Sequence, residues 1–243
     1  MPRSSSRGRF RALLPTKRLR SPGAEMTVTG SGNRRVYWGQ GSAPSRRVLI
    51  GLAEKGLDFQ SIQLDFANNE HKGPDVLKLN PRGQLPTFDD NGVVVNESIA
   101  ALQYLEEAYP EPALLPQALP KRALVLQRTH EALNIQAAFR AIQAFKTNPA
   151  SPEFKEKLAA LRTELALWEA YLEQGDYLAG SSFSIADIAA APFLLKIQWA
   201  GATLDGFPRL HKYLATLKGR KSIQATENAL NHANPDTYFK GIL

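Results

Sequence analysis

The sequence contains no cysteine. This absence excludes disulfide bonds, thiolate metal sites and a cysteine nucleophile. The chain also lacks any run of 18 apolar residues, so we expect no membrane-spanning helix and no membrane partner. The four histidines are scattered, and no two have the spacing of metal ligands; we therefore expect no metal site at His71, His130, His211 or His232.

Acidic residues are scarce near the N-terminus, where the positive charge is concentrated. Residues 1–25 contain seven basic residues and one acidic residue, which accounts for +6 of the net charge of +7. The rest of the chain is therefore nearly neutral and offers no long-range attraction for nucleic acid. We expect no nucleic-acid partner.

Residues 1–33 differ in composition from the rest of the chain. They are rich in Arg, Ser, Gly and Pro, and they lack the long apolar segment of a secretory signal. Such a leader resembles organelle transit peptides, but we favour a disordered tail, or translation that begins at Met26, over targeting. We expect a cytoplasmic protein, with organelle import through this extension as the alternative.

Residues 34–111 alternate between strand and helix patterns. The element order is β-α-β-α-β-β-α, which predicts a thioredoxin-like layered domain over this range. The expected strands lie at 34–39, 58–65, 87–88 and 93–95, and the expected helices at 46–56, 74–79 and 98–108.

The second half of the chain shows only helical patterns. Four prolines between residues 110 and 120 indicate a linker, which we assign to 112–121. A Ser-x-x-Asp capping box at Ser184–Asp187 opens one of the later helices. We therefore expect an all-helical domain over 122–243, with helices at 122–146, 152–174, from 185 onward, and at 208–217.

The stretch from residue 80 to 107 carries the strongest functional signal. Leu85 precedes a proline at the start of a short strand, and Pro86 cannot donate to a ladder, so the backbone of Leu85 is a candidate partner for an extended peptide. Glu97 and Ser98 lie at a helix N-terminus, which attracts a carboxylate. The two features together suit a small anionic peptide.

This stretch resembles a known family. The segment NPRGQLPTF at residues 80–88, followed by Asn-Glu-Ser and a Leu/Tyr-rich helix, is similar to the glutathione-binding domain of cytosolic glutathione transferases. The likeness extends over 34–243 and is closest to the rho class, with theta- and delta-like features. It implies conjugation of the glutathione thiolate to hydrophobic electrophiles, with glutathione as co-substrate and no bound cofactor. It also implies a homodimer in which the Tyr104 side of one domain faces the partner's helical domain.

The thiolate of glutathione needs stabilisation near neutral pH, which a hydroxyl donor and a helix N-terminus provide. Residues 42–45, Ser-Ala-Pro-Ser, resemble the segment that carries the catalytic serine of theta- and delta-like classes, and the resemblance places that role on Ser42. A pre-helical serine is also a common helix cap. Tyr37, at the end of the first strand, and Ser45 are the alternatives.

The family resemblance also implies how glutathione is held. The backbone of Leu85, before Pro86, would pair with the cysteinyl unit. Glu97 would take the ammonium group of the γ-glutamyl unit, and Ser98 its α-carboxylate.

The contacts of the glycine end stay open. His71, Lys72 and Gln84 are the candidates for its carboxylate. Delta-like enzymes have a histidine where this chain has Gly83. The electrophile would lie in a pocket lined by Tyr37, Trp38, Asn134, Phe139, Arg140 and Tyr238, with Phe239 helping to close it.

Two other functions fit the same scaffold. One is glutathione-dependent peroxidase or isomerase chemistry, although the lack of cysteine argues against thiol transfer through an enzyme disulfide. The other is a non-catalytic ligand-binding or assembly module.

Overall fold

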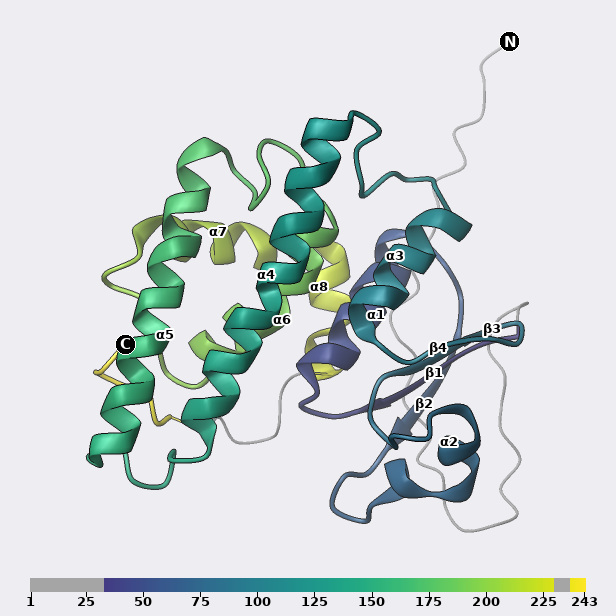
Figure 1. The fold of residues 1–243 in the computed structure, drawn as a ribbon, viewed down its shortest axis with the longest axis horizontal. Coiled ribbons are helices and arrows are strands. Elements are labelled where there is room, and N and C mark those ends of the chain that lie inside the picture. The colour runs from purple at the N-terminus through teal and green to yellow at the C-terminus, as the bar shows by residue number, and fades with distance from the viewer. Residues whose placement is uncertain (1–32, 230–236) are drawn as a thin grey trace.

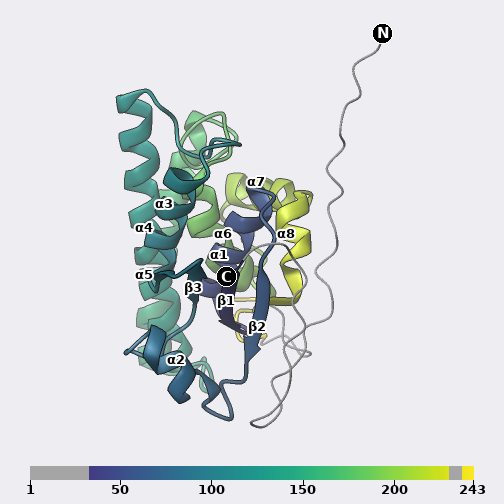
Figure 2. The ribbon, with the colours of Figure 1, turned by 90° about the vertical axis from the view of Figure 1, so that its right-hand side faces the viewer.

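The computed structural model describes residues 33–229 and 237–243. A small sheet and the short helix α2 lie on one side, the long helices α4 and α5 lie on the other, and α1 and α3 lie between them (Figure 1). In the turned view, α7 and α8 lie on the opposite side of the molecule from α4 and α5 (Figure 2). The extension expected over 1–33 lies, apart from Asn33, outside the described residues.

The first half forms a mixed four-stranded sheet in the order β2-β1-β3-β4. β1 and β2 are parallel, whereas β3 is antiparallel to both β1 and β4. This arrangement confirms the thioredoxin-like prediction. The elements are β1 (Arg34–Gly39), α1 (Ala43–Glu54), β2 (Gln60–Leu64), a 3-10 turn (Glu70–Lys72), α2 (Pro74–Leu79), β3 (Thr87–Asp90), β4 (Val93–Val95) and α3 (Ser98–Ala108).

The described part of the second half contains helices and no strands, which confirms the all-helical prediction. Helix α6 lies at its centre and is apolar on nearly all sides, as expected for a helix packed against α4, α7 and α1. The elements are α4 (Leu119–Gln143), α5 (Pro152–Tyr171), a 3-10 turn (Leu172–Gln174), α6 (Ile185–Trp199), α7 (Pro208–Lys218), α8 (Lys221–Ala225) and a 3-10 turn (Glu227–Ala229).

Two helices begin earlier than the sequence pattern indicates. α1 starts at Ala43 rather than 46, and α4 starts at Leu119 rather than 122. In both, a proline (Pro44, Pro120) stands in the first turn, where its missing N–H leaves no hydrogen bond unmade. The sequence pattern assigns these prolines to the preceding loops, and the structure corrects it.

The β3–β4 hairpin is longer than expected. β3 continues through Asp90, so the turn consists of Asn91 and Gly92, with φ angles of 54° and 95°. Positive φ at both positions is the geometry that Asn-Gly favours between paired strands. Helix α8 was not expected, because five residues are too few to show a helical period.

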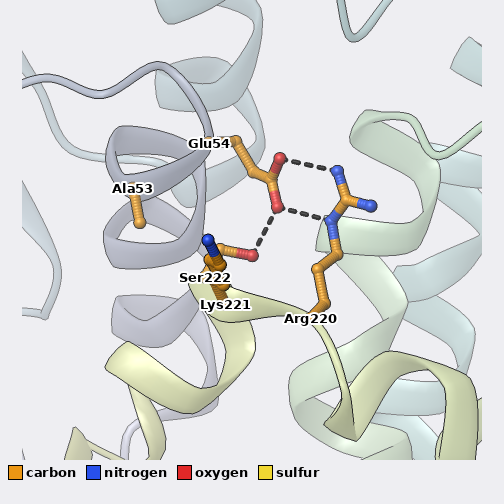
Figure 3. A pocket seen from close by; sticks show the side chains of 5 residues that line it. All are labelled: Ala53, Glu54, Arg220, Lys221 and Ser222. Carbon is orange, nitrogen blue, oxygen red and sulfur yellow. Dashed lines mark hydrogen bonds and ion pairs between the residues drawn. The ribbon is translucent and has the colours of Figure 1, made fainter. Parts of the chain in front are cut away.

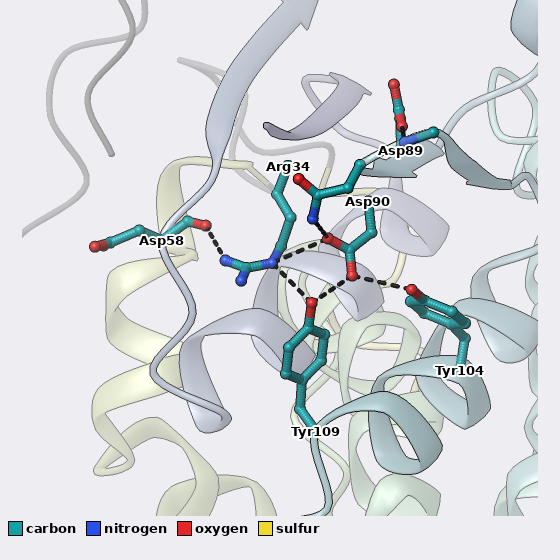
Figure 4. Close-up of polar contacts among 8 residues, drawn as sticks. Arg34, Asp58, Asp89, Asp90, Tyr104 and Tyr109 are labelled. Carbon is teal, nitrogen blue, oxygen red and sulfur yellow. Dashed lines mark hydrogen bonds and ion pairs between the residues drawn. The ribbon is translucent and has the colours of Figure 1, made fainter. Parts of the chain in front are cut away.

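A polar cluster at the end of β3 ties the sheet to α3 (Figure 4). The buried Asp90 carboxylate accepts hydrogen bonds from the hydroxyls of Tyr104 at 3.0 Å and Tyr109 at 2.6 Å, and it pairs with Arg34 at 3.2 Å. Burial and the Asp90 carboxylate raise the pKa of Tyr104 to about 12. The Tyr104 hydroxyl is therefore held as a neutral donor to Asp90.

The capping box of α6 is confirmed and is part of a larger network. Asp187 is fully buried and accepts from the backbone N–H groups of Ser184 at 2.9 Å and Leu178 at 3.0 Å. The Tyr213 hydroxyl, from α7, donates to the same carboxylate at 2.9 Å. Burial raises the pKa of Asp187, while these donors act in the opposite direction. One carboxylate thus joins the start of α6 to the preceding loop and to α7.

We expect Asp187→Ala to lower the free energy of unfolding by about 3 kcal/mol or more, because it leaves several buried donors without a partner. Tyr213→Phe removes one donor and should cost about 1–2 kcal/mol. Urea unfolding followed by circular dichroism measures both values. A cost for Asp187→Ala no larger than that for Tyr213→Phe would contradict a central role for the carboxylate.

Candidate active site

The turn between β1 and α1 presents Ser42 as the N-cap of α1. Its Oγ accepts hydrogen bonds from the Ser45 backbone N–H at 3.2 Å and from the Ser45 hydroxyl at 2.9 Å. Both bonds use acceptor capacity of the Ser42 oxygen, so its own O–H remains available as a donor. The capping function and a donor function are therefore compatible at this one side chain.

The two alternative hydroxyls are less accessible than that of Ser42. Ser45 is completely buried and donates its hydroxyl proton to Ser42. Tyr37 is 8% exposed and packs with Val76 and Leu85 on the α2 side of the sheet, where burial raises its pKa. Of the three candidates, Ser42 is the one with a partly exposed side chain.

Two distant segments brace the Ser42 turn. The Gly41 N–H donates to the carbonyl of Ala229 at 2.9 Å, and the Lys196 ammonium donates to the carbonyl of Gly41 at 2.6 Å. Gly41 has a φ of 79°, which favours glycine. The bond from Lys196 places a positive charge beside the α1 N-terminus. The sequence pattern carries no sign of this contact, since Lys196 belongs to α6.

The peptide bond between Leu85 and Pro86 is cis. The Leu85 side chain is buried, and among the described residues its backbone N–H and C=O make no hydrogen bond. The Asn80 side-chain amide donates to the carbonyl of Gln84 at 2.8 Å and to Thr87 Oγ1 at 3.3 Å, which holds this loop in place. The backbone of Leu85 can therefore accept and donate to an extended chain.

Glu97 and Ser98 lie at the N-terminus of α3, as expected. Glu97 is the N-cap residue, is exposed and makes no capping bond with its side chain. Ser98 is the first helical residue and is 6% exposed. Its Oγ accepts from Nη1 of Arg47, on α1, at 3.3 Å.

The three candidates for the glycine end lie around one loop. The 3-10 turn 70–72 packs against Gly83, whose added Cβ would come within 2.7 Å of the Lys72 side chain and 3.1 Å of the His71 carbonyl oxygen. The Lys72 ammonium donates to the carbonyl of Arg82 at 2.9 Å, and Gln84 is exposed beside it. With a φ of 53°, this position suits glycine rather than the histidine of delta-like enzymes.

Three residues expected to line the electrophile pocket are buried in cores instead: Tyr37, described above, Trp38 and Phe139. Trp38 is 4% exposed, packs between the sheet and helices α1 and α3, and donates to Ser61 Oγ at 2.8 Å. The alternation of β1 places it on the opposite face from Tyr37. Phe139 is 1% exposed and packs edge-on against Phe193 and beside Phe239. A pocket-lining role for these residues stays a prediction.

The other expected pocket residues remain at the surface or near it. Asn134 and Arg140 are exposed on α4, and Tyr238 is half-buried against Phe239 with ring centroids 4.6 Å apart. Phe239 itself is fully buried and anchors the end of the chain in the helical core.

Two surface cavities lie away from Ser42. One of about 220 Å³ lies at the opposite end of α1 (Figure 3). There Arg220 holds the Glu54 carboxylate through two hydrogen bonds of 2.6 and 2.7 Å, and the Ser222 hydroxyl donates to the same group. This cluster fastens α8 to α1. A second cavity of similar volume lies between α6 and α8 and is lined in part by Arg46 and Trp199.

Arg47 is a site residue that sequence reasoning missed. It lies four residues after Ala43 and three before Ile50, which is the spacing of a buried helical stripe, and all three side chains are buried. A charged residue at a position that the helical pattern predicts to be buried was the signal in the sequence that could have identified Arg47.

In the part of the chain that the structure describes, none of the helices has the length and apolar character that a membrane span requires, and no cluster of three potential metal ligands occurs.

Comparison with known proteins agrees with this geometry. Residues 41–108 match the model of the glutathione S-transferase N-terminal domain, and residues 134–221 match that of the C-terminal domain. Glutathione S-transferase A of Pleuronectes platessa is 38% identical over 204 residues, which covers 79% of this chain and 89% of that protein.

Solved structures show the same relationship. A glutathione S-transferase from the Antarctic clam Laternula elliptica is 37% identical with a TM-score of 0.81, covering 87% of this chain and all of that one. A delta-class glutathione transferase from Nilaparvata lugens is 28% identical with a TM-score of 0.75, covering 82% and 95%. The chain belongs to the glutathione S-transferase family, whose enzymes use glutathione as co-substrate. Its class within the family stays a prediction.

We expect Gly83→Ala to destabilise the protein by about 1–3 kcal/mol, because it combines positive φ with the close approach of His71 and Lys72. Gly56→Ala is the matched control: its φ of 63° is similar, but nothing lies within 4 Å of an added Cβ. Urea unfolding should show the larger loss for Gly83→Ala. Equal losses would mean that the packing of the 3-10 turn against Gly83 contributes nothing.

Proposed function

We propose that this protein conjugates the glutathione thiolate to hydrophobic electrophiles and that the Ser42 hydroxyl stabilises the thiolate. The observation that carries the proposal is the hydrogen bonding of Ser42, whose oxygen accepts twice from Ser45 and so keeps its proton for a third partner. The position at the N-terminus of α1 adds the favourable field of the helix dipole. Lys196, bonded to the neighbouring carbonyl of Gly41, adds positive charge.

The rest of the tripeptide would lie along the loop before β3 and the start of α3. In this proposal the unpaired backbone groups of Leu85 bond to the cysteinyl unit, as in the addition of a strand to a sheet edge. Glu97 receives the ammonium group, and Ser98 with the first N–H groups of α3 receives the α-carboxylate.

We assign the glycine carboxylate to the surface formed by His71, Lys72 and Gln84. Lys72 supports this assignment. Its ammonium group is held at the loop by a hydrogen bond to the carbonyl of Arg82, and it has two further N–H protons to donate.

The electrophile would approach Ser42 from the side of the helical domain. With Tyr37, Trp38 and Phe139 buried, the candidates for contacting it are exposed or half-buried side chains: Asn134 and Arg140 on α4, and Tyr238 near the end of the chain. Conjugation then gains rate in two ways: the thiol is held as its reactive anion, and both reactants are held together. The same two effects would serve peroxide reduction or isomerisation, so a screen of aryl halides, epoxides and hydroperoxides distinguishes these reactions.

We also propose a homodimer, following the family resemblance. In it the side of the first domain that carries Tyr104 faces the partner's helical domain. Tyr104 is partly exposed, and its hydroxyl is held by Asp90, so its ring has a fixed orientation at this surface. Light scattering coupled to size-exclusion chromatography should give twice the mass of the chain, and the mass of a single chain would contradict the dimer.

We expect Ser42→Ala to lower turnover with an aryl halide by about tenfold or more near neutral pH, because a rise of about one unit in the thiol pKa leaves about a tenth as much thiolate. The pKa of bound glutathione's thiol should rise in the variant, so the deficit should shrink as the pH increases. Ultraviolet absorbance of the bound thiolate measures this pKa directly, and calorimetry should show that glutathione still binds.

Ser45→Ala and Tyr37→Phe are the controls, because each removes one of the alternative hydroxyls. Tyr37→Phe should leave the thiol pKa close to that of the parent protein. Ser45→Ala loses the hydroxyl bond to Ser42 but keeps the backbone N–H bond, so it should raise the thiol pKa less than Ser42→Ala does. If Ser42→Ala leaves the thiolate absorbance unchanged while Tyr37→Phe abolishes it, the assignment to Ser42 is wrong.

A further inference from the structure

Arg47 is a buried cation at the junction of the two halves of the protein. Its side chain is 1% exposed. Nε donates to the carbonyl of Ala189 at 2.7 Å, Nη1 to Gln136 Oε1 at 3.0 Å and Nη2 to the carbonyl of Ala132 at 3.5 Å. The guanidinium also lies 5.0 Å from the centre of the Phe193 ring. All of these partners are electrically neutral.

No carboxylate of the described residues forms an ion pair with Arg47. Burial lowers the pKa of Arg47 to about 9, and the positive charge of Arg140 acts in the same direction. A buried charge without a counter-ion is costly, and apolar residues often replace even paired buried charges without loss of stability. The stability of the fold alone therefore does not explain why an arginine occupies this position.

The guanidinium is directed at the start of α3. In addition to its bond with Gln136, Nη1 donates to Ser98 Oγ at 3.3 Å. With an oxygen lone pair engaged by Arg47, the Ser98 hydroxyl is oriented to donate its proton to a different partner. A carboxylate in front of Ser98 would meet this O–H, the free N–H groups of the first turn of α3, and a positive charge directly behind them.

We propose that Arg47 is a positioning and specificity residue, which orients the Ser98 hydroxyl and supplies the charge by which the enzyme selects peptides that carry a γ-glutamyl α-carboxylate. This inference rests on the proposed binding of glutathione at Ser98. The neutral surroundings of Arg47 are consistent with this role, because a carboxylate of the protein itself would neutralise the guanidinium charge before the substrate binds.

Gln136→Glu tests the proposal while keeping Arg47 in place. The new carboxylate lies where the amide now accepts from Nη1 at 3.0 Å, so it supplies the missing counter-ion and should preserve or raise the melting temperature. Gln127→Glu, at an exposed position of the same helix, adds the same charge away from Arg47. It replaces the hydrogen bond from Gln127 to Glu131 by a like-charge contact, so it serves as the control for peptide binding and not for melting temperature.

Two peptides measured by calorimetry separate recognition of the carboxylate from other effects. One is glutathione; the other replaces its γ-glutamyl unit by 4-aminobutanoyl, which keeps the ammonium but lacks the α-carboxylate. The parent protein should prefer glutathione. Gln136→Glu should weaken glutathione binding by about fivefold or more, a factor that corresponds to about 1 kcal/mol, and change binding of the analogue by less than twofold. Gln127→Glu should change neither.

Steady-state kinetics and direct replacement of Arg47 give a second test. Gln136→Glu should raise KM for glutathione and leave kcat nearly unchanged, since the lost interaction is made equally in the ground and transition states. Arg47→Lys, which retains the charge, should keep part of the preference for glutathione, and Arg47→Gln should lose it.

Three results would overturn the inference. They are a parent protein that binds both peptides equally, a Gln136→Glu variant that retains full preference for glutathione, and an equal loss for both peptides that follows the melting temperature. A parent protein that binds neither peptide would instead overturn the proposed function itself.

Discussion

The burial of α1 on two sides is the constraint on which the rest of the structure depends. One side of the helix packs with the sheet and α3 through Val48, Leu49 and Leu52, and the other packs with the helical half through Ala43 and Ile50. A helix enclosed in this way cannot shift without opening both cores. Its N-terminus, where a thiolate would be stabilised, is therefore held in a fixed position.

Polar side chains fasten α1 at both ends and in its middle. Glu54 is clamped by Arg220 near the C-terminus, Arg47 crosses to α4 and α6, and the turn before the helix is bonded to Lys196 and Ala229. All these partners lie far from α1 in the sequence. The candidate active site belongs to the first half of the chain, but its rigidity comes from the second half.

Three buried charged groups of the protein differ in how they are satisfied. Asp187 and Asp90 are buried carboxylates surrounded by donors, and both connect structural elements. Arg47 differs from them in having only neutral partners among the described residues. The first two groups are satisfied within the protein, whereas in the proposal above the charge of Arg47 is matched by the carboxylate of the bound peptide. Asp187 and Asp90 therefore have structural roles, whereas the role we propose for Arg47 is substrate recognition.

Much of the fold could be read from the sequence, because periodicity, prolines and capping residues act locally. The order of elements, the capping box at Ser184 and the turn at Gly92 all depend on neighbouring residues. Helix starts were misplaced where a proline stood in the first turn rather than in the preceding loop, as at Pro44.

The sequence by itself determined the elements and the short segments around Ser42, Leu85 and Ser98, since each depends on chemistry within a few residues. Only the tertiary structure decided which side chains are accessible. It buried Trp38 in a core and brought Arg47 behind Ser98. The physical reason is that burial and electrostatic environment arise from packing between segments far apart in the chain, and no local pattern records which segments meet.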